Sequence, residues 1–392
     1  MDFLLLLAAL VGHTALWAAL INRVHSSSFS YYVGKRLAQV GLVMLGSIPV
    51  VFGLWFVAAD LAILGGSGGR PIPWPGRTYL VVCWVLAAMT LVWWLCRPLV
   101  HRDPKVVRSH RSERVGPLGL PASSPWERNG HHLLLRVPGN EVLHLDLSHR
   151  VLEVARLPAA LDGLTIAHLS DFHFARHTRK AYFEEVVRLG NRFEADLVAV
   201  TGDVLEHSDF IEWIPDTLGK LEGRYGVYFV LGNHDTKADV PRLRRSLTEL
   251  GLVDLGGRWV EIRIAGEPIL LAGNELPWLK PAADLSDAPA GAAHGGPPRI
   301  ALSHSPDQFG WARKNDFDLL LAGHTHGGQV RLPWIGPILT PSRTGVRYAS
   351  GVFYTPPTVM HVTRGISGEH PIRLNCPPEI TRLVLKKPEG RD

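Results

Sequence analysis

Three long apolar stretches in the first hundred residues constrain the fold more than any other feature of the sequence. Residues 3–21, 37–64 and 78–97 are almost continuously apolar, and the third stretch is rich in tryptophan. A helix of about 20 apolar residues is long enough to cross a bilayer. We therefore predict a membrane region of three helices over residues 1–98. A cleaved signal peptide is the alternative for the first stretch, but no basic start or small-x-small cleavage site accompanies it.

The lysines and arginines beside these stretches predict how the chain is oriented. The first connecting loop carries Arg23, Lys35 and Arg36, whereas the second carries only Arg70 and Arg77. A dense basic group follows the third stretch: Arg97, Arg102, Lys105, Arg108, Arg111 and Arg114. Because basic residues concentrate on the cytoplasmic side, we predict a multi-pass protein whose large carboxy-terminal domain is cytoplasmic.

The segment after the third stretch has the composition of a linker. Residues 99–130 are rich in charge, Pro, Gly and Ser, which is typical of a solvated connection. The alternative is that its basic residues also hold anionic lipid headgroups, at roughly 1 kcal/mol each. We predict that the soluble domain begins at residue 131, with a hairpin of strands over residues 132–137 and 141–147.

Composition excludes several classes of function. The formal net charge of +5 is modest for 392 residues, and no interleaving of aromatic and basic residues indicates nucleic-acid binding. Three cysteines cannot form a disulfide framework, which favours a reducing compartment for the soluble part. Nothing in the sequence specifies a protein partner or an oligomeric state.

Short apolar runs alternate with helix-like stretches through the soluble part. Five strand-like runs end in polar residues: 164–169, 196–201, 227–231, 299–303 and 318–322. Helical periodicity covers residues 178–193, 210–221 and 241–250, and further strands are predicted at 260–264, 269–272, 358–363 and 382–385. This order favours an α/β sandwich with a second sheet. Ligand sites in open α/β sheets lie beyond the carboxyl ends of strands, where the polar residues fall.

Seven side chains at these strand ends form a candidate metal-ligand set: Asp171, His173, Asp203, Asn233, His304, His324 and His326. Carboxylate, amide and imidazole groups suit borderline divalent metals without thiolate. Seven ligands exceed the four of a tetrahedral zinc site. They suit two metals that lie roughly 3.5–4 Å apart and share a bridging carboxylate. Such a pair stabilises the attacking and leaving oxygens of an in-line displacement at phosphorus. Each motif alone is also compatible with an ordinary turn or helix cap.

The ordered motifs resemble those of the calcineurin-like dinuclear metallophosphoesterases over residues 162–386. They are Asp171-x-His173, Gly202-Asp203, Gly232-Asn233-His234-Asp235, His304 and Gly323-His324-Thr325-His326. Further residues resemble a membrane-associated bacterial branch that includes exported phosphoesterases and UDP-2,3-diacylglucosamine hydrolases: Gly327-Gly328-Gln329, Pro341-Ser342, Gly345, Tyr348, Arg364-Gly365 and Cys376-Pro377-Pro378-Glu379. The resemblance implies a four-layer α/β/β/α sandwich behind three transmembrane helices, in the inner membrane.

The resemblance also implies a role for each residue of the motifs. Asp171, His173 and His326 would bind one metal, Asn233, His304 and His324 the other, and Asp203 would bridge them. His234 would stabilise the transition state or protonate the leaving oxygen, and Asp235 would orient His234. The metals would be manganese, iron or zinc, and a hydroxide between them would attack phosphorus.

These expectations describe a membrane-tethered hydrolase of a phosphodiester or pyrophosphate, with a lipid-linked nucleotide such as UDP-2,3-diacylglucosamine as a candidate substrate. The alternatives are a broad-specificity phosphodiesterase and a metal-binding membrane sensor without catalysis. Glu369-His370-Pro371 departs from the small or hydroxylated residues expected in this branch. The resemblance therefore supports the metal ligands more strongly than it supports the identity of the substrate. Residues 282–298, rich in Ala, Gly and Pro, form a flexible insertion or, alternatively, a lid.

Overall fold

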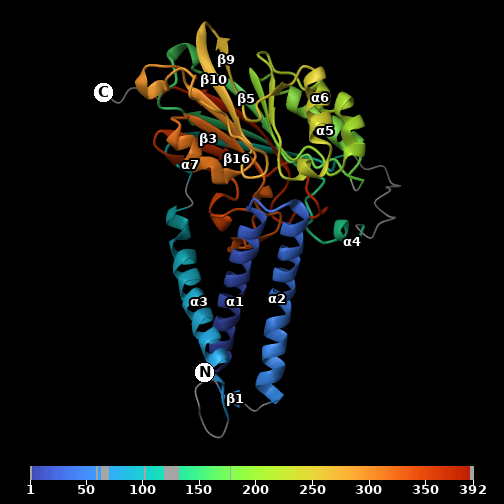
Figure 1. The fold of residues 1–392 in the computed structure, drawn as a ribbon, viewed down its shortest axis with the longest axis vertical. Helices are drawn as coiled ribbons and strands as arrows, with labels where there is room; N and C mark the ends of the chain where they lie inside the picture. The colour runs from blue at the N-terminus through green and yellow to red at the C-terminus, as the bar shows by residue number, and fades with distance from the viewer. Residues whose placement is uncertain are drawn as a thin grey trace. The chain divides into compact units, whose positions relative to one another are not determined.

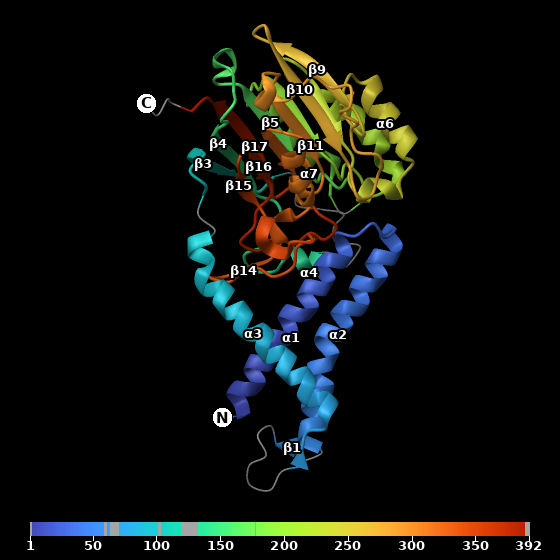
Figure 2. The same ribbon diagram turned by 60° about the vertical axis from the view of Figure 1, so that its left-hand side comes forward.

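The computed structural model of the chain describes residues 2–58, 61–62, 70–100, 103–118, 132–176 and 178–388. The chain divides into two compact units, Met1–Arg102 and Asp103–Asp392. Figures 1 and 2 show the elements of each unit from two directions.

The first unit contains three long helices, α1 (Asp2–His25), α2 (Tyr31–Ala58) and α3 (Trp74–Val100). All three are long and apolar enough to cross a membrane. Helix α1 packs against both of the others. A Cβ atom on Gly12 would lie 1.7 Å from the Cys83 carbonyl oxygen, so only glycine allows α1 and α3 to approach this closely. The Trp84 indole donates a hydrogen bond to the Leu5 carbonyl across the same contact, at 2.9 Å.

The helices start and end at different residues from the predicted apolar stretches. The prediction placed the second helix at 37–64, but α2 begins at Tyr31 and its last described residue is Ala58. The first and third helices likewise extend beyond residues 3–21 and 78–97. Hydropathy detects only the apolar part of a helix, whereas backbone hydrogen bonding continues into polar turns. The short strands β1 (Leu61–Ala62) and β2 (Arg70–Pro71) pair between α2 and α3.

The second unit is built on two mixed sheets. One sheet has the strand order β3-β4-β17-β5-β6-β7-β8, and the other has the order β15-β16-β12-β11-β10-β9. The strands of the first sheet are β3 (Val107–Val115), β4 (Leu145–Glu153), β5 (Thr165–Leu169), β6 (Leu197–Thr201), β7 (Val227–Val230), β8 (Val253–Asp254) and β17 (Glu379–Lys386). Those of the second are β9 (Trp259–Ile264), β10 (Glu267–Asn274), β11 (Arg299–Ser303), β12 (Leu319–Ala322), β15 (Gly351–Thr355) and β16 (Thr358–Val362).

Three apolar cores hold these sheets in a four-layer α/β/β/α sandwich. The central core lies between the sheets and joins residues such as Ile166 and Leu383 to Leu302 and Leu321. An outer core packs α5 (Lys180–Asn191) and α6 (Val240–Glu249) on the seven-stranded sheet, and another packs α7 (Phe309–Lys314) on the six-stranded sheet. Figure 1 shows α5 and α6 together on one outer face and α7 on the other. The predicted fold class is therefore confirmed.

The predicted linker and hairpin are wrong in part. Strand β3 lies inside residues 99–130 and pairs antiparallel with β4, and α4 (His132–Leu135) replaces the first predicted strand. The second strand, predicted at 141–147, is β4, which starts at Leu145. Strand β3 is a charged edge strand, a composition that protects sheet edges but resembles a linker. Residues 101–102 and 119–131 of the predicted linker lie outside the described residues.

Three members of the basic group, Arg108, Arg111 and Arg114, are therefore part of the sheet. Arg108 pairs with Glu153 at 2.6 Å, and Arg114 contacts Asp146 at 2.8 Å and Glu141 at 2.7 Å. These ion pairs connect the edge strand β3 to β4 and to the turn before it. They add a structural role to the lipid contacts considered for this group.

Short 3₁₀ helices and one small hairpin complete the second unit. A single α-helix was predicted over residues 210–221, but two 3₁₀ helices occupy it, with Pro215 inside the first. The 3₁₀ helices are η2 (Ala159–Leu161), η3 (Ser208–Asp216), η4 (Leu218–Lys220), η5 (His234–Lys237), η6 (Ala292–His294), η7 (Pro306–Gln308), η8 (His326–Gly328) and η9 (Gly345–Tyr348). Strands β13 (Arg331–Leu332) and β14 (Gly336–Pro337) form a separate antiparallel pair.

Candidate metal centre

Five parallel strands bring the seven predicted ligands to one edge of the sandwich. Strands β5, β6 and β7 run parallel in one sheet, and β11 and β12 run parallel in the other. Each ends one to three residues before a predicted ligand. The Nδ1 atom of His304, after β11, lies 2.7 Å from the Thr201 carbonyl at the end of β6, which connects the two sheets at this edge.

The backbone at the ligands is strained. Five of the seven predicted ligands have a positive φ: Asp171 (57°), His173 (48°), Asp203 (53°), His324 (70°) and His326 (49°). Left-handed backbone costs a non-glycine residue about 1–2 kcal/mol. Such strain persists only where the surrounding structure enforces it, and it clusters at functional sites. The concentration of strain here is evidence for a functional centre.

Glycines beside the ligands allow this close approach. A Cβ atom on Gly232 would lie 2.2 Å from Oδ1 of Asp203, and one on Gly323 would lie 2.5 Å from Oδ2 of Asp171. Both distances are far below van der Waals contact. Any larger residue at either position would displace a carboxylate of the centre.

The first cluster contains Asp171, His173, Asp203 and His326, whose donor atoms lie within 4.8 Å of one another. The Nε2 atoms of His173 and His326 are 3.1 Å apart, and Oδ1 of Asp171 lies 3.4 Å from Nε2 of His326. The opposite nitrogens face outward, with Nδ1 of His173 at 2.5 Å from Oε1 of Glu206 and Nδ1 of His326 at 3.1 Å from the Ser367 carbonyl. Because the Glu206 contact places the N–H of His173 on Nδ1, the Nε2 lone pair of His173 is directed inward, toward Nε2 of His326.

The second cluster contains Asp203, His304 and His324. Nε2 of His304 lies 3.1 Å from Nδ1 of His324 and 3.2 Å from Oδ1 of Asn233. The Thr201 carbonyl accepts the N–H of His304 Nδ1, so Nε2 is the nitrogen left to face a cation, whether a proton or a metal ion. Nitrogen and oxygen donors that converge in this way repel one another unless a cation lies between them. The structure thus brings all seven predicted residues together in two adjacent clusters.

Asp203 belongs to both clusters. Its Oδ1 accepts the backbone N–H of His234 at 2.8 Å. Its Oδ2 lies 3.5 Å from Nε2 of His173 and 3.1 Å from Nε2 of His304, and it accepts no conventional hydrogen bond although it is buried. A buried carboxylate oxygen in this position fits a ligand shared by two cations.

The centre attracts positive charge. Burial alone would raise the pKa of Asp203, but the His304 and His234 imidazoles hold it well below its usual value. Burial would lower the pKa of His304, and the facing Asp203 carboxylate instead raises it to about 9. The donor set, its burial and its charge all fit divalent cations.

The region around His234 contradicts one predicted role. The carboxylate of Asp235 accepts the backbone N–H groups of Gly232 at 2.8 Å, Val204 at 2.9 Å and Leu205 at 3.1 Å. Burial, followed by the charge of Asp203, raises the pKa of Asp235 to about 7. Asp235 therefore fastens the β7 loop to the β6 loop, and the prediction that it orients His234 is wrong.

Glu206 occupies the position that the sequence assigned to Asp235. Its Oε1 lies 2.6 Å from Nδ1 of His234 and 2.5 Å from Nδ1 of His173, and its Oε2 pairs with Lys237. Burial would raise the pKa of Glu206, but His234 and His173 hold it far below its usual value, so the side chain is ionised. Sequence reasoning missed Glu206 because it lies three residues beyond the Gly-Asp motif, outside any recognised pattern.

Arg373 is a second residue that the sequence did not reveal. It is fully buried, and it donates from Nη1 to the carbonyls of His326 at 3.0 Å and Arg364 at 2.8 Å. It also donates from Nη2 to the Ser367 carbonyl. Arg373 thus fixes the loop that carries His326 from behind. No local pattern marks it, because the groups that its guanidinium contacts are up to 47 residues away in the chain.

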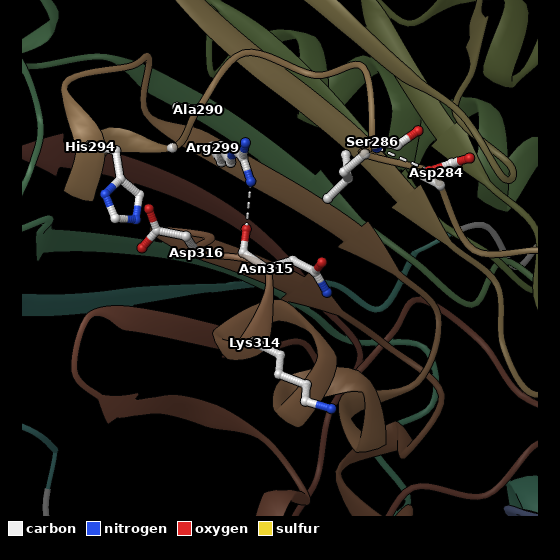
Figure 3. Close-up of a pocket in the computed structure, with 11 residues that line it drawn as sticks. Asp284, Ser286, Ala290, His294, Arg299, Lys314, Asn315 and Asp316 are labelled. Atoms are coloured by element: carbon white, nitrogen blue, oxygen red, sulfur yellow. Dashed lines mark hydrogen bonds between the residues drawn. The ribbon is translucent and has the colours of Figure 1, made fainter.

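The Ala-, Gly- and Pro-rich segment 282–298 does not form a lid over this centre. Figure 3 shows its residues lining a pocket with Arg299, Lys314, Asn315 and Asp316. Arg299 begins β11, and Asp316 lies just before β12. The backbone N–H of Ala293 donates to Asp316 at 3.2 Å. The segment therefore runs from the carboxyl end of β10, where the Ala283 N–H donates to the Gly273 carbonyl at 3.1 Å, to the amino ends of β11 and β12, away from the metal centre.

Comparison with protein families identifies the second unit. The family model for calcineurin-like phosphoesterases matches residues 164–328, which include all seven predicted ligands. The second unit is a calcineurin-like metallophosphoesterase domain. Membership of this hydrolase family implies divalent metal ions, in agreement with the two clusters.

Curated relatives of this calcineurin-like protein include enzymes and a membrane protein. Phosphodiesterase YaeI of Escherichia coli is 29% identical over 225 residues, covering 56% of this chain and 81% of the relative. UDP-2,3-diacylglucosamine pyrophosphatase LpxG of Chlamydia muridarum is 26% identical over 281 residues, covering 57% and 85%. A transmembrane protein with a metallophosphoesterase domain from Bos taurus is 31% identical over 253 residues, covering 59% and 55%.

Proposed function

We propose that this protein is a membrane-tethered hydrolase that cleaves a phosphodiester or pyrophosphate bond in a lipid-linked molecule. The observation that carries the proposal is the convergence of four inward-facing imidazoles, two carboxylates and one amide on two adjacent points. Two divalent cations held there would supply an activated water nucleophile and offset charge on phosphoryl oxygens. Manganese, iron and zinc all accept this donor set.

In this proposal each cluster holds one cation. Asp171, His173 and His326 would hold the first, and Asn233, His304 and His324 would hold the second. Asp203 would be shared by both, because its carboxylate faces an imidazole of each cluster. The strained backbone fixes these donors in place before substrate arrives, which lowers the reorganisation needed in the reaction.

His234 acts as the proton donor to the leaving oxygen. Its side chain is 12% exposed, so it lies at the rim of an otherwise buried centre. The contact with Glu206 through Nδ1 fixes the ring, and Nε2 then faces the substrate oxygen that departs. Glu206 also supports the positive charge that His234 carries as a general acid. Glu206 is therefore a positioning residue for His234 and for the metal ligand His173.

The membrane region and the relatives support a lipid-linked substrate. The helices that could cross a membrane belong to the same chain as the metal centre, so lipid phosphoesters are at high local concentration. One relative is named for the pyrophosphate UDP-2,3-diacylglucosamine and another as a phosphodiesterase. We propose an inner-membrane location with the catalytic domain in the cytoplasm, where nucleotide sugars are made.

Hydrolysis of bis-p-nitrophenyl phosphate by the full-length protein in detergent with manganese tests the activity. We expect Asp203→Ala to lower the rate by at least about a thousandfold, because both cations lose a ligand. The control is Asp162→Asn, which removes a carboxylate that contacts Lys386 at 2.8 Å on the protein surface. An Asp203→Ala rate equal to that of the control would contradict the mechanism.

Product analysis tests the substrate. After incubation with UDP-2,3-diacylglucosamine in mixed micelles, mass spectrometry should detect UMP and the acylated sugar phosphate. Turnover of bis-p-nitrophenyl phosphate without release of UMP would indicate a phosphodiesterase of broader specificity.

Reporter fusions after residue 115 test the orientation of the chain in the membrane. An extracytoplasmic signal would overturn both the cytoplasmic location and this substrate.

A further inference from the structure

The exposed apolar side chains of the second unit are concentrated in one hairpin. Among its described residues, five large apolar side chains are exposed: Leu250, Leu332, Trp334, Ile335 and Leu339. Four of the five lie within residues 332–339, and Trp334 is 91% exposed. We call residues 330–340, which contain β13 and β14, the tryptophan hairpin. Soluble surfaces rarely gather large apolar residues in this way, and such patches mark interaction sites.

The tip of the tryptophan hairpin is strained. The N–H of Ile335 donates to the Pro333 carbonyl at 2.7 Å, which closes a γ-turn around Trp334. Trp334 has a φ of 60°, a left-handed conformation that bulky residues avoid. Glycine or asparagine would adopt this turn at lower cost in free energy. The turn itself does not require tryptophan, and a large apolar side chain at so exposed a tip indicates a function at the surface.

The base of the hairpin is fixed to the metal centre. Nε of Arg331 donates to the Gly327 carbonyl at 2.8 Å, and Nη2 donates to Ser350 at 2.6 Å. A Cβ atom on Gly328 would lie 2.4 Å from Cβ of Pro337, so the second strand packs directly on the η8 turn. That turn begins with the predicted ligand His326. The base of the hairpin is therefore fixed to the turn that carries His326.

We propose that the tip of the tryptophan hairpin inserts into the interfacial layer of the lipid bilayer. Tryptophan is enriched at membrane interfaces, where its apolar ring and polar N–H are both accommodated. The proximity of this chain to a bilayer follows from its connectivity. Only residues 101–106 separate α3 from β3, and a segment of this length spans at most roughly 25 Å when fully extended.

Basic residues near the hairpin favour an anionic lipid surface. Arg343 and Arg347 follow the hairpin in sequence, and both are exposed. Basic groups close to the surface of an anionic leaflet are attracted to its headgroups. The combination of an apolar tip with exposed arginines fits lipid better than a second copy of an apolar protein surface.

This inference rests on the proposed function and deepens it. A hairpin anchored both in the bilayer interface and beside His326 would present the metal centre to phosphoester groups at headgroup level. Lipid-linked substrates would then reach the centre without leaving the bilayer. Water-soluble phosphodiesters would not need the hairpin.

Spin labelling of the full-length protein in lipid nanodiscs tests the docking directly. A nitroxide is attached at Trp334→Cys and, as the matched control, at Leu250→Cys, an exposed apolar residue directly after α6, in a Cys96→Ser background. Cys83 and Cys376 are buried and remain in place. We expect the label at 334 to show at least threefold greater relaxation by oxygen than by a water-soluble nickel chelate, and the label at 250 the reverse. Nanodiscs with and without anionic lipid measure the contribution of the arginines.

Each outcome decides the proposal. A label at 334 that is as accessible to the nickel chelate as the label at 250 would overturn it. Protection of the label at 334 from both reagents would also overturn it, because this result assigns the hairpin to a protein interface. Exclusion of nickel with access to oxygen supports it.

Kinetics separate this inference from the proposed function. We expect the double substitution Trp334→Ser and Ile335→Ser to lower the rate on a lipid-embedded phosphodiester about tenfold, with an unchanged rate on bis-p-nitrophenyl phosphate. Equal rates on the lipid substrate before and after substitution would contradict docking while the hydrolase function stands. Absence of turnover on every phosphoester in the unsubstituted protein would contradict the function, and the spin-label result would still decide the docking.

Discussion

The two halves of the metal centre are supported in different ways. In the first half, the outward nitrogen of His173 contacts the ionised carboxylate of Glu206, and the buried cation of Arg373 lies behind His326. In the second half, the outward nitrogen of His304 contacts the backbone carbonyl of Thr201. The Trp278 ring packs on His304 and His324 there, with ring centroids 5.7 and 4.7 Å apart.

This difference separates electrostatic from steric support. A carboxylate that accepts the outward N–H of an imidazole raises the basicity of the inward nitrogen, so the ring binds a metal more strongly, and it fixes the orientation of the ring. A backbone carbonyl orients the ring but carries no net charge. We infer that the first half depends on charges which substitution can remove, whereas the second depends on packing.

The largest effect should come from removing one imidazole of either half. We expect His326→Ala to deplete the first cation and His324→Ala the second. Each should lower activity at least about 100-fold, because substitution of a residue that only supports a metal ligand already costs about 10- to 100-fold. Elemental analysis of the purified full-length protein should find close to one metal per chain in each variant. Equal loss of both metals in both variants would mean that the centre does not divide as proposed.

A smaller effect should follow from Glu206→Gln. The amide keeps the size of the side chain but removes the charge behind His173 and His234, so we expect a 10- to 100-fold loss of activity. Metal titration should show weaker binding at the first position and unchanged binding at the second. The matched control is Asp209→Asn, a neighbouring carboxylate that is 60% exposed. Indistinguishable titrations for the two variants would remove Glu206 from its positioning role.

The smallest effect should come from Trp278→Leu. Aromatic contacts contribute about 0.5–1.5 kcal/mol, so loss of the indole should weaken metal binding in the second half roughly threefold to tenfold. Binding in the first half should be unchanged, which competition with a chelator measures. Weaker binding in the first half instead would show that packing and charge are not divided between the halves.

Local pattern predicted much of this protein because its chemistry follows its strands. The predicted ligands come directly after short apolar runs, and parallel strands necessarily bring their carboxyl ends to one edge. Strand β3 was missed because its exposed, charged residues resemble a linker. Glu206 and Arg373 were missed because each acts on residues far away in the chain. Adjacency also misled the prediction for Asp235, whose carboxylate turns away from its neighbour His234 toward backbone N–H groups.

By itself, the sequence determined the three apolar helices, the alternation of strands and helices, and the identity of the donors at the strand ends. These features depend on residues that are close in the chain, where periodicity and hydropathy act. The tertiary structure alone decided which donors face each other, which oxygen of Asp203 lies between the clusters, and which carboxylate supports His234. It also placed a strained, exposed tryptophan in a hairpin whose base is fixed to the turn that carries His326. These features depend on the packing of two sheets, which joins residues more than 100 positions apart, such as Thr201 and His304.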